Sequence, residues 1–292
     1  MTVRNLVSVI VPAYNASSFI EETLRSVLTQ THNSLELICI NDGSTDSTLS
    51  LLRKMEAQDD RITVIDKVNS GVCDTRNLGI IKANGEFIIF LDADDVWESR
   101  MLETCVAVFN SQTNVNAIYT KGQLINENTE KLDRYIEAEQ INGVEDILEW
   151  KKNHVATPSC TIMRTAVIEQ SGIWDTNLST AADQDFFLRI AQHFPIHAIN
   201  EVLFYYRVHG NNMHQNIALM EKDHLYVFKK ADKNGLFKSK SFRRQCFAGL
   251  YLILAGSWWK DGKNKFRGLK MLVKAVFVYP PIVFKLMKKL VG

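Results

Sequence analysis

Three aspartates, Asp92, Asp94 and Asp95, directly follow the apolar run at residues 88–91. Carboxylates this close repel one another, and burying any of them without a partner is costly. The only basic residue nearby is Arg100, so a divalent cation such as Mg²⁺ or Mn²⁺, which prefers oxygen ligands, would balance their charge. The alternative interpretation is a charged loop that caps the following helix, and the cluster alone does not decide between the two.

Other polar residues suited to chemistry carry similar alternatives. Asp42, in the stretch NDGSTDS, suits a contact with a nucleotide base or ribose, but this composition also favours a turn that caps a helix. His209 and Arg207 end an apolar stretch, where a histidine is often structural. Asp183 and Asp185 open a predicted helix, whose dipole favours carboxylates even without a catalytic role.

Apolar strands and amphipathic helices alternate over the first hundred residues. Strands are predicted at residues 6–14, 35–42, 61–66 and 86–95, with helices at 17–30, 43–58 and 75–85 between them. This alternation predicts a parallel sheet flanked by helices, in which ligands bind at the carboxyl ends of the strands. The residues that fall at such ends, and are therefore expected on one rim, are Asn15, Asp42, Asp92, Asp94 and Asp95.

The order weakens after this stretch. Helices are predicted at residues 101–112 and 181–194, and strands at 115–122 and 198–209, whereas the polar stretch 125–155 shows no clear pattern. The chain has 292 residues with 46% hydrophobic and 23% charged, which is typical of a globular protein. Its five cysteines are scattered without CxxC spacing, which favours a reducing compartment, and its first residues lack the features of a signal peptide.

Six segments in a fixed order carry a resemblance to a known family. They are VSVIVPAYNASSFIEETLRSVLTQT, LICINDGSTDST, GVCDTRNLGI, GEFIIFLDADDVW, ADQDFFLRIA and YYRVHGNN. Together they resemble the family 2 glycosyltransferases of the GT-A fold, over about residues 5–215. The resemblance implies an α/β catalytic domain at residues 1–215, with a mostly parallel central sheet flanked by helices. It also implies inverting, metal-dependent transfer of a hexose or N-acetylhexosamine from a UDP-sugar to a hydroxyl of a saccharide or lipid-linked acceptor, in cell-surface polysaccharide synthesis.

The resemblance also implies roles for single residues. The positions it assigns to the nucleotide and its phosphates are Pro12, Ala13, Tyr14, Asn15, Asp42, Arg76, Asp92, Ala93 and Arg207. Asp42 is expected to meet the uracil and Asp92 the ribose. Asp94 and His209 are expected to hold Mn²⁺ or Mg²⁺, and Asp183 is expected to be the catalytic base.

Three positions depart from the family pattern. Asn41 stands before Asp42 where the family usually has Asp, Ala182 stands before Asp183 where it usually has Glu, and Asp74 stands where a small residue is common. The second departure leaves Asp185 as an alternative base. It also leaves open a catalytically inactive subunit that binds nucleotide sugars or assists membrane assembly. A sugar nucleotidyltransferase is a weaker alternative, because the stretch VPAYNASS lacks the glycines of a phosphate-binding loop.

The charges of the two parts of the chain are opposite. Residues 1–215 contain 17 Lys and Arg against 29 Asp and Glu, whereas residues 216–292 contain 17 against 4. The second part, called the basic tail below, has apolar stretches shorter than the ~20 residues of a spanning helix. Within residues 263–277 one predicted helical face carries large apolar side chains, namely Phe266, Leu269, Leu272, Val273, Val276 and Phe277.

Together with Trp258 and Trp259, this apolar face among basic residues predicts contact with an anionic membrane surface. The protein is therefore expected in the cytoplasm, peripheral on the cytosolic face of the inner membrane. The alternative is a helical hairpin that packs on the catalytic domain, and a homodimer through the tail is a further option. Nucleic acid is not expected as a partner, because the basic tail is rich in large aliphatic residues and the first part is acidic.

Overall fold

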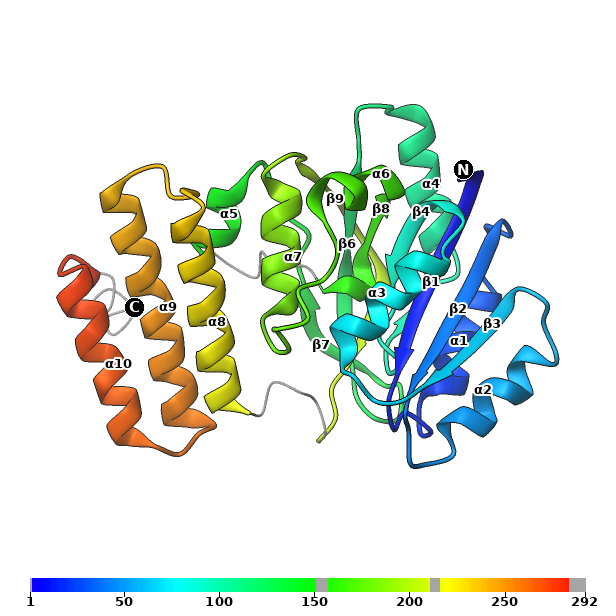
Figure 1. Cartoon of the computed structure of the whole chain (residues 1–292), viewed down its shortest axis with the longest axis horizontal. Coiled ribbons are helices and arrows are strands. Elements are labelled where there is room, and N and C mark those ends of the chain that lie inside the picture. The colour runs from blue at the N-terminus through cyan, green and yellow to red at the C-terminus, as the bar shows by residue number, and fades with distance from the viewer. Residues whose placement is uncertain (1, 151–156, 211–215, 284–292) are drawn as a thin grey trace.

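The computed structural model describes residues 2–150, 157–210 and 216–283 (Figure 1). Within these residues, one mixed sheet forms the centre of the molecule. Its strands in spatial order are β3 (Ile62–Lys67), β2 (Leu35–Asp42), β1 (Val3–Ala13), β4 (Gly85–Phe90), β8 (Thr161–Arg164), β6 (Ala117–Ile125), β9 (Ile196–Arg207) and β5 (Val96–Trp97), with β7 (Lys131–Ile136) paired with β6.

The first four strands in this order are parallel, as the alternating pattern predicted. β1 lies between β2 and β4, with Ala13 opposite Asn41 and Ile10 opposite Phe90. Three helices connect these strands in the chain, namely α1 (Ile20–Leu28), α2 (Thr48–Glu56) and α3 (Val72–Lys82). The inner strands are buried almost throughout, which explains their continuous apolar sequences. Their carboxyl ends therefore share one edge of the sheet.

The other half of the sheet is mixed. β8 is antiparallel to both β4 and β6, β9 is parallel to β6, and β5 is antiparallel to β9. The stretch 125–155, which the sequence did not resolve, contains β7 and the short α5 (Val144–Leu148), while its last residues lie outside the described part. The remaining helices here are α4 (Met101–Ser111), the 3₁₀ turn η1 (Pro158–Cys160), α6 (Thr165–Ser171) and α7 (Ala182–Ala191).

Three helices form the basic tail at one end of the molecule, namely α8 (Ile217–Lys233), α9 (Lys240–Lys260) and α10 (Lys265–Val278). α8 packs against α7, and α10 is the helix farthest from the sheet (Figure 1). Ile217, Phe228 and Phe247 belong to the same buried apolar cluster as the strands of the sheet. The core therefore continues across residue 216, where the sequence had suggested a domain boundary.

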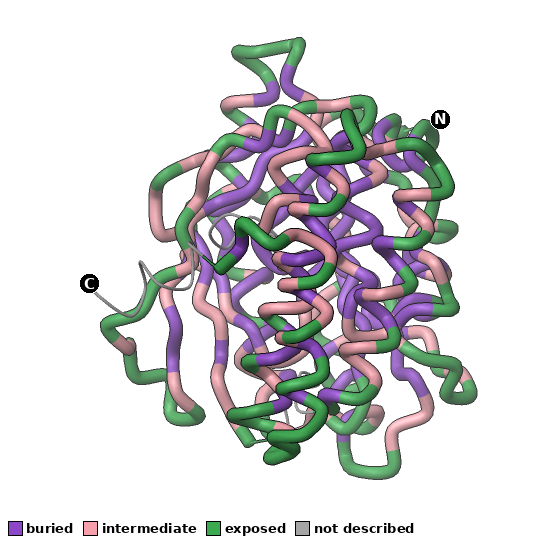
Figure 2. Tube along the Cα trace, turned by 90° about the vertical axis from the view of Figure 1, so that its left-hand side faces the viewer, coloured by how far each residue is buried: buried purple, intermediate pink, exposed green. Residues whose placement is uncertain are grey.

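One expectation for the tail is wrong. Trp258 does not face outward: it is 7% exposed, and its indole N–H donates a hydrogen bond to Glu221 of α8 at 2.6 Å. The neighbouring Trp259 is 49% exposed. Figure 2, which views the molecule from the end formed by the tail, shows exposed and buried segments alternating along the chain. Among the residues described, no helix combines the length and apolar character needed to cross a bilayer.

Candidate active site

The loop after β1 places the first group of predicted nucleotide-binding residues. Pro12 and Ala13 are buried in β1, whereas Tyr14 and Asn15 are exposed beyond it. Asn15 adopts a positive φ of 49°, and its side-chain oxygen accepts the backbone N–H of Thr45 at 2.8 Å. This bond ties the loop after β1 to the loop after β2. Of the four residues, only Tyr14 and Asn15 present side chains to a ligand.

Asp42 ends β2 and uses both carboxylate oxygens within the protein. It accepts the backbone N–H groups of Ser70 and Gly71, at 2.9 and 3.0 Å, and pairs with the ammonium group of Lys67 at the end of β3. Burial alone would raise the pKa of Asp42, but the ammonium and the two amides outweigh it and hold the pKa below its usual value. Any ligand that approaches Asp42 would therefore meet Lys67 as well.

Gly43 follows Asp42 and explains why the chain can turn so closely here. Its φ is +67°, and a Cβ at this position would lie 2.7 Å from the backbone nitrogen of Asn69. Any other residue would combine backbone strain with a collision against the β3–α3 loop. The close neighbour of this glycine in the structure is therefore the protein itself.

Arg76 of α3 joins the loop at residues 91–95, called the aspartate loop below, to the predicted base Asp183. Its guanidinium donates to Asp92 Oδ1 at 2.7 Å and to Asp183 Oδ1 at 3.1 Å. The side chain is only 4% exposed, and its guanidinium carbon lies 4.4 Å from the ring centre of Trp174, which stacks on Phe186. Both charge and packing therefore fix Arg76, so it can hold the two carboxylates at a constant separation.

Asp183 is the better placed of the two candidate bases. Its side chain is 37% exposed, and burial of its surroundings together with the Asp92 charge raises its pKa to about 6 despite the nearby Arg76. Asp185 is only 2% exposed and pairs with Arg189 at 2.9 Å and with Lys230 at 2.8 Å. Its carboxylate is committed to these two cations, which argues against Asp185 as the alternative base.

Asp94 and His209 meet from two distant parts of the chain. Asp94 Oδ2 lies 2.8 Å from His209 Nε2, at the same edge of the sheet. Burial and the Asp92 charge raise the pKa of Asp94, and burial with both neighbouring carboxylates raises the pKa of Asp95 well above its usual value. The protein's own cations therefore leave this acidic cluster incompletely neutralised, which a divalent cation would correct.

The donor set fits such a cation in part. A carboxylate and an imidazole are both ligands for Mn²⁺, and Mg²⁺ is commonly held by one or two carboxylates with substrate phosphate and water. In the described part of the chain, no group of three or more His, Cys, Asp or Glu side chains is arranged to hold a metal. Asp94 and His209 would therefore act together with oxygens from outside the protein.

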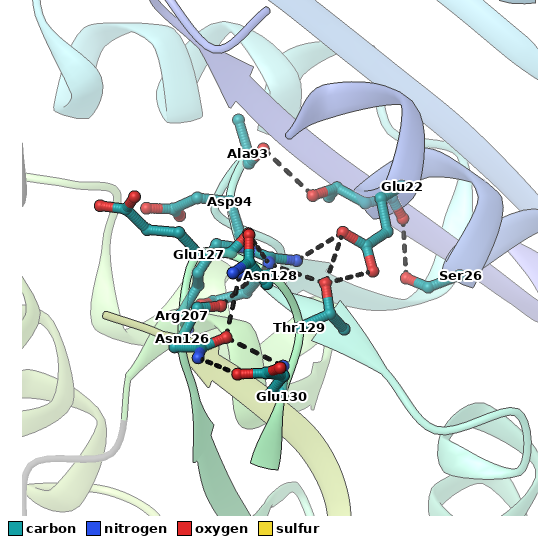
Figure 3. A network of polar contacts seen from close by, with 12 residues as sticks. Glu22, Ser26, Ala93, Asp94, Asn126, Glu127, Asn128, Thr129, Glu130 and Arg207 are labelled. Atoms are coloured by element: carbon teal, nitrogen blue, oxygen red, sulfur yellow. Dashed lines mark hydrogen bonds and ion pairs between the residues drawn. The ribbon is translucent and has the colours of Figure 1, made fainter. Parts of the chain in front are cut away.

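Arg207 lies at the centre of a polar network (Figure 3). Its side chain is fully buried, whereas Glu22 is 43% exposed and Thr129 is exposed. Its backbone N–H bonds to Asp95 at 3.0 Å, and Ala93 beside this network accepts the hydroxyl of Thr23 at 3.0 Å. The oxygens that accept its guanidinium N–H groups, at 2.7 to 3.2 Å, belong to Asp94, Asn126, Glu127, Thr129 and Glu22.

Arg207 thus ties together the aspartate loop, the β6–β7 turn and α1. Its guanidinium also lies 4.8 Å from the ring centre of Phe19. The resemblance implied that Arg207 reaches the diphosphate, but this network would have to open before its guanidinium could do so. In this structure the residue supports the loop that carries Asp94 instead.

Three residues of the site escaped the sequence analysis. Lys67 directly ends a strand, so the same rule of strand ends that placed Asp42 would have found it. Trp174 lies in an unpatterned loop, and its role beneath Arg76 has no sequence signal. Asp223 of α8 bonds to the segment that precedes Asp183, and its only signal is that it is an acid in a basic tail.

Comparison with known proteins shows the family of the chain. The model of the family described as Glycosyl transferase family 2 matches residues 8–172. The chain belongs to glycosyl transferase family 2. Among similar proteins, a glycosyltransferase of Bacillus subtilis (strain 168) named for teichuronic acid biosynthesis, TuaG, is 32% identical over 81% of this chain and 92% of its own length. The chondroitin synthase of Pasteurella multocida (strain Pm70) is 27% identical over 76% of this chain, which spans only 23% of that longer protein.

Solved structures give the fold of this family 2 glycosyltransferase. The structure of S. aureus TarS 1–349 has a TM-score of 0.64 and 21% identity, and the match covers 97% of this chain and 82% of that one. The mannosyltransferase PcManGT from Pyrobaculum calidifontis, in complex with GDP-Man and Mn²⁺, has a TM-score of 0.60 and 18% identity, over 97% and 87% of the two chains. The GT-A fold and a glycosyltransferase activity expected from the sequence are thus confirmed.

Proposed function

We propose that this glycosyltransferase moves a hexose or N-acetylhexosamine from a UDP-sugar to a hydroxyl of a saccharide or lipid-linked acceptor, with inversion, in cell-surface polysaccharide synthesis. The names of TuaG and of the chondroitin synthase support the polysaccharide, and a TarS structure in complex with UDP-GlcNAc supports the donor class. The observation that carries the proposal is the bridge from Arg76 to Asp92 and Asp183. Through Arg76, this bridge joins Asp92, which is expected to face the nucleotide, to Asp183, whose raised pKa suits a base.

In the proposed reaction Asp183 takes the proton of the acceptor hydroxyl. The acceptor oxygen forms a bond to the anomeric carbon as the bond from that carbon to the diphosphate breaks, and the electron pair leaves with UDP. A positioned base of this kind contributes about 10²–10⁴-fold to the rate. Arg76 would keep Asp183 oriented, and Asp92 would face the ribose. Asp94 and His209 would hold Mn²⁺ or Mg²⁺, which supplies positive charge to the leaving diphosphate.

Calorimetric binding of a panel of nucleotides and nucleotide sugars tests the donor class. The panel includes UDP, GDP, UDP-glucose, UDP-GlcNAc and GDP-mannose, each with Mn²⁺, with Mg²⁺ and with a chelator. We expect UDP and one UDP-sugar to bind only with a divalent ion, and Asp94→Asn to weaken that binding. Arg4→Gln, far from the rim, is the matched control. Absence of any nucleotide binding with metal present would contradict the proposal.

The proposal extends to the place where the enzyme works, the cytosolic face of a membrane, through the outer face of α10. That helix turns its small or flexible residues, Gly268, Met271 and Ala275, toward the protein. Large apolar side chains are exposed on its other side, with exposed fractions of 79%, 50%, 60% and 84% for Phe266, Leu269, Val273 and Phe277. Aromatic and aliphatic groups in this arrangement suit insertion at the level of lipid headgroups.

Charge favours an anionic membrane over a second copy of the chain. Six basic residues and one acid surround this face, namely Lys260, Lys263, Lys265, Arg267, Lys270, Lys274 and Asp261. A symmetric dimer through the same face would bring two such basic rims together, and the like charges would repel. An anionic bilayer instead attracts each cation, by about 1 kcal/mol near its surface.

Sedimentation with vesicles tests this contact. We expect the protein to bind vesicles that contain phosphatidylglycerol and not vesicles of phosphatidylcholine alone. The double variant Phe266→Glu/Phe277→Glu should lose binding, whereas Ile81→Glu, at a 74% exposed apolar residue of α3, should not. A dimer in sedimentation equilibrium that the double variant abolishes, without vesicle binding by the unmodified chain, would assign the face to a second copy instead.

A further inference from the structure

The segment that leads into the catalytic helix is held by a side chain from the tail. Asp223 of α8 accepts three hydrogen bonds with one carboxylate oxygen, from the backbone N–H of Ser179 at 3.0 Å, the backbone N–H of Thr180 at 2.9 Å and the hydroxyl of Thr180 at 3.1 Å. The residue is only 2% exposed. A buried carboxylate that accepts several N–H groups is a strong and geometrically specific anchor.

A second anchor lies two turns along the same helix. The Lys230 ammonium bonds to Asp175 at 2.7 Å and to Asp185 at 2.8 Å. Burial would raise the pKa of Asp175, but Lys230 and the loop around Asn177 lower it to about 2, and the two carboxylates in turn raise the pKa of Lys230. Lys230 therefore ties the start of the segment to the first turn of α7.

The helix that carries Asp183, α7, has no capping side chain of its own at its N-terminus. The residue at its N-cap is Ala181, which makes no side-chain hydrogen bond to the first turn. A capping side chain normally fixes where a helix begins, and its loss destabilises the helix. Here Asp223 binds the backbone one and two residues before Ala181. The tail helix thus supplies from outside the fixation that the sequence of α7 lacks.

From this we propose that Asp223 and Lys230 are positioning residues for Asp183. Neither touches the reacting atoms, and both act through the segment at 175–181. Arg76 holds the carboxylate of Asp183 from the side of the sheet, while α8 holds the start of its helix from the side of the tail. This inference rests on the proposed role of Asp183 as the base. It gives Asp223 and Lys230 of α8 a supporting role for the active site, although the resemblance to the family ends before this helix.

Replacing Asp223 by asparagine tests the inference, because the side chain keeps its size and loses its charge. A displacement of a base by about 1 Å is enough to lower turnover about 10²-fold. We expect kcat per UDP-binding site to fall about 10- to 100-fold with the UDP dissociation constant unchanged within about twofold. A second variant, Lys230→Met, should act in the same direction. The matched controls are Lys222→Ala and Lys229→Ala, at exposed residues beside the two anchors.

Counting turnover per UDP-binding site separates positioning from folding, because molecules that do not fold do not bind UDP. If Asp223→Asn fails to fold, Thr180→Val removes only the hydroxyl bond and should still lower kcat per site. Unchanged kcat per site in the variants that fold would overturn the inference.

Hydrogen exchange at Ser179 and Thr180 provides a readout that does not need activity. We expect exchange there to accelerate in Asp223→Asn and to stay unchanged in Lys222→Ala, and equal exchange in the two variants would also overturn the inference. If the unmodified chain binds UDP and transfers no sugar, the proposed function fails, whereas the exchange result still decides whether Asp223 holds this segment.

Discussion

The catalytic part and the basic tail use charged residues in opposite ways. Around the rim of the sheet, charges are buried or half-buried and meet partners from distant elements, as Arg76 meets Asp92 and Asp183. On α10 the cations are mostly exposed and surround an apolar face. The balance of residues 1–215 is −12 and that of residues 216–292 is +13. Charge in the first region is paired at defined points, whereas in the second it is spread over a surface that we propose to contact a membrane.

α8 is where this contrast breaks down. It belongs to the basic tail by sequence, yet Asp223 and Lys230 serve the catalytic side with the same buried, paired geometry as the rim. The difference between the regions therefore follows three-dimensional position and not the order of the chain. Four substitutions or conditions can sharpen or break this comparison.

The largest effect on turnover is expected at Asp183, because it is the single group proposed to accept the proton. Asp183→Asn removes the proton acceptor but keeps the size of the side chain, so kcat should fall about 10²–10⁴-fold. Binding of UDP, measured by calorimetry, should persist. Glu169→Gln, at an exposed acid of α6, is the control and should cost far less. Transfer at an unchanged rate would remove Asp183 from the mechanism.

The next effect concerns stability, and it contrasts a buried cation of β9 with an exposed cation of α1. Arg207→Met leaves several acceptors around a fully buried position without donors, which should lower the free energy of unfolding by about 3 kcal/mol. Arg25→Met breaks only a pair with Glu21 at 3.8 Å whose arginine is 64% exposed, so the loss should stay below about 0.5 kcal/mol. Urea denaturation measures both, and equal losses would contradict the structural role of Arg207.

The pH dependence of transfer tests the electrostatics of the rim. Asp183 must be deprotonated to accept a proton, and its pKa is raised to about 6. We expect kcat/KM to fall about tenfold per pH unit below that value and to level off above it. The residual activity of Asp183→Asn should lack this step. A flat profile between about pH 5 and 7 would show that another group is the base.

The smallest effect is expected for single charges of the tail, because many cations share the attraction. Lys270→Gln should weaken binding to phosphatidylglycerol vesicles by about 1 kcal/mol, or roughly fivefold. Added salt should weaken binding of the unmodified chain in the same assay. Lys82→Gln, an exposed cation of α3, should have no effect, and equal losses in the two variants would argue against a localised contact.

Much of the rim was predictable because strand ends are visible in a sequence. Asn15, Asp42 and Asp92 each follow an apolar run, and parallel pairing then places them on one edge. That Asp94 and His209 lie together could be predicted only from the resemblance to the family, which assigns both residues to the same metal ion. Periodicity similarly predicted the apolar face of α10.

What the sequence did not predict depends on contacts between elements that lie far apart in the chain. Arg207 is buried because Glu22 and Thr129, from α1 and the β6–β7 turn, close around it. Trp258 is buried because Glu221 of another helix accepts its N–H. The local sequence around each of these residues is compatible with exposure, so only the assembled fold could show otherwise.

The continuous core across residue 216 has a consequence for recombining this enzyme with its relatives. A chimera joined at the end of β9 would separate Asp223 from the loop that it holds and expose Ile217 and Phe228, two buried residues of the tail. A junction between α8 and α9, at residues 234–239, would keep Asp223 with its loop and break only contacts between α8 and the outer hairpin, such as that of Phe228 with Phe247. Exchange of the hairpin that we propose to contact the membrane should therefore preserve turnover at this second junction when the new α9 keeps an aromatic residue opposite Phe228.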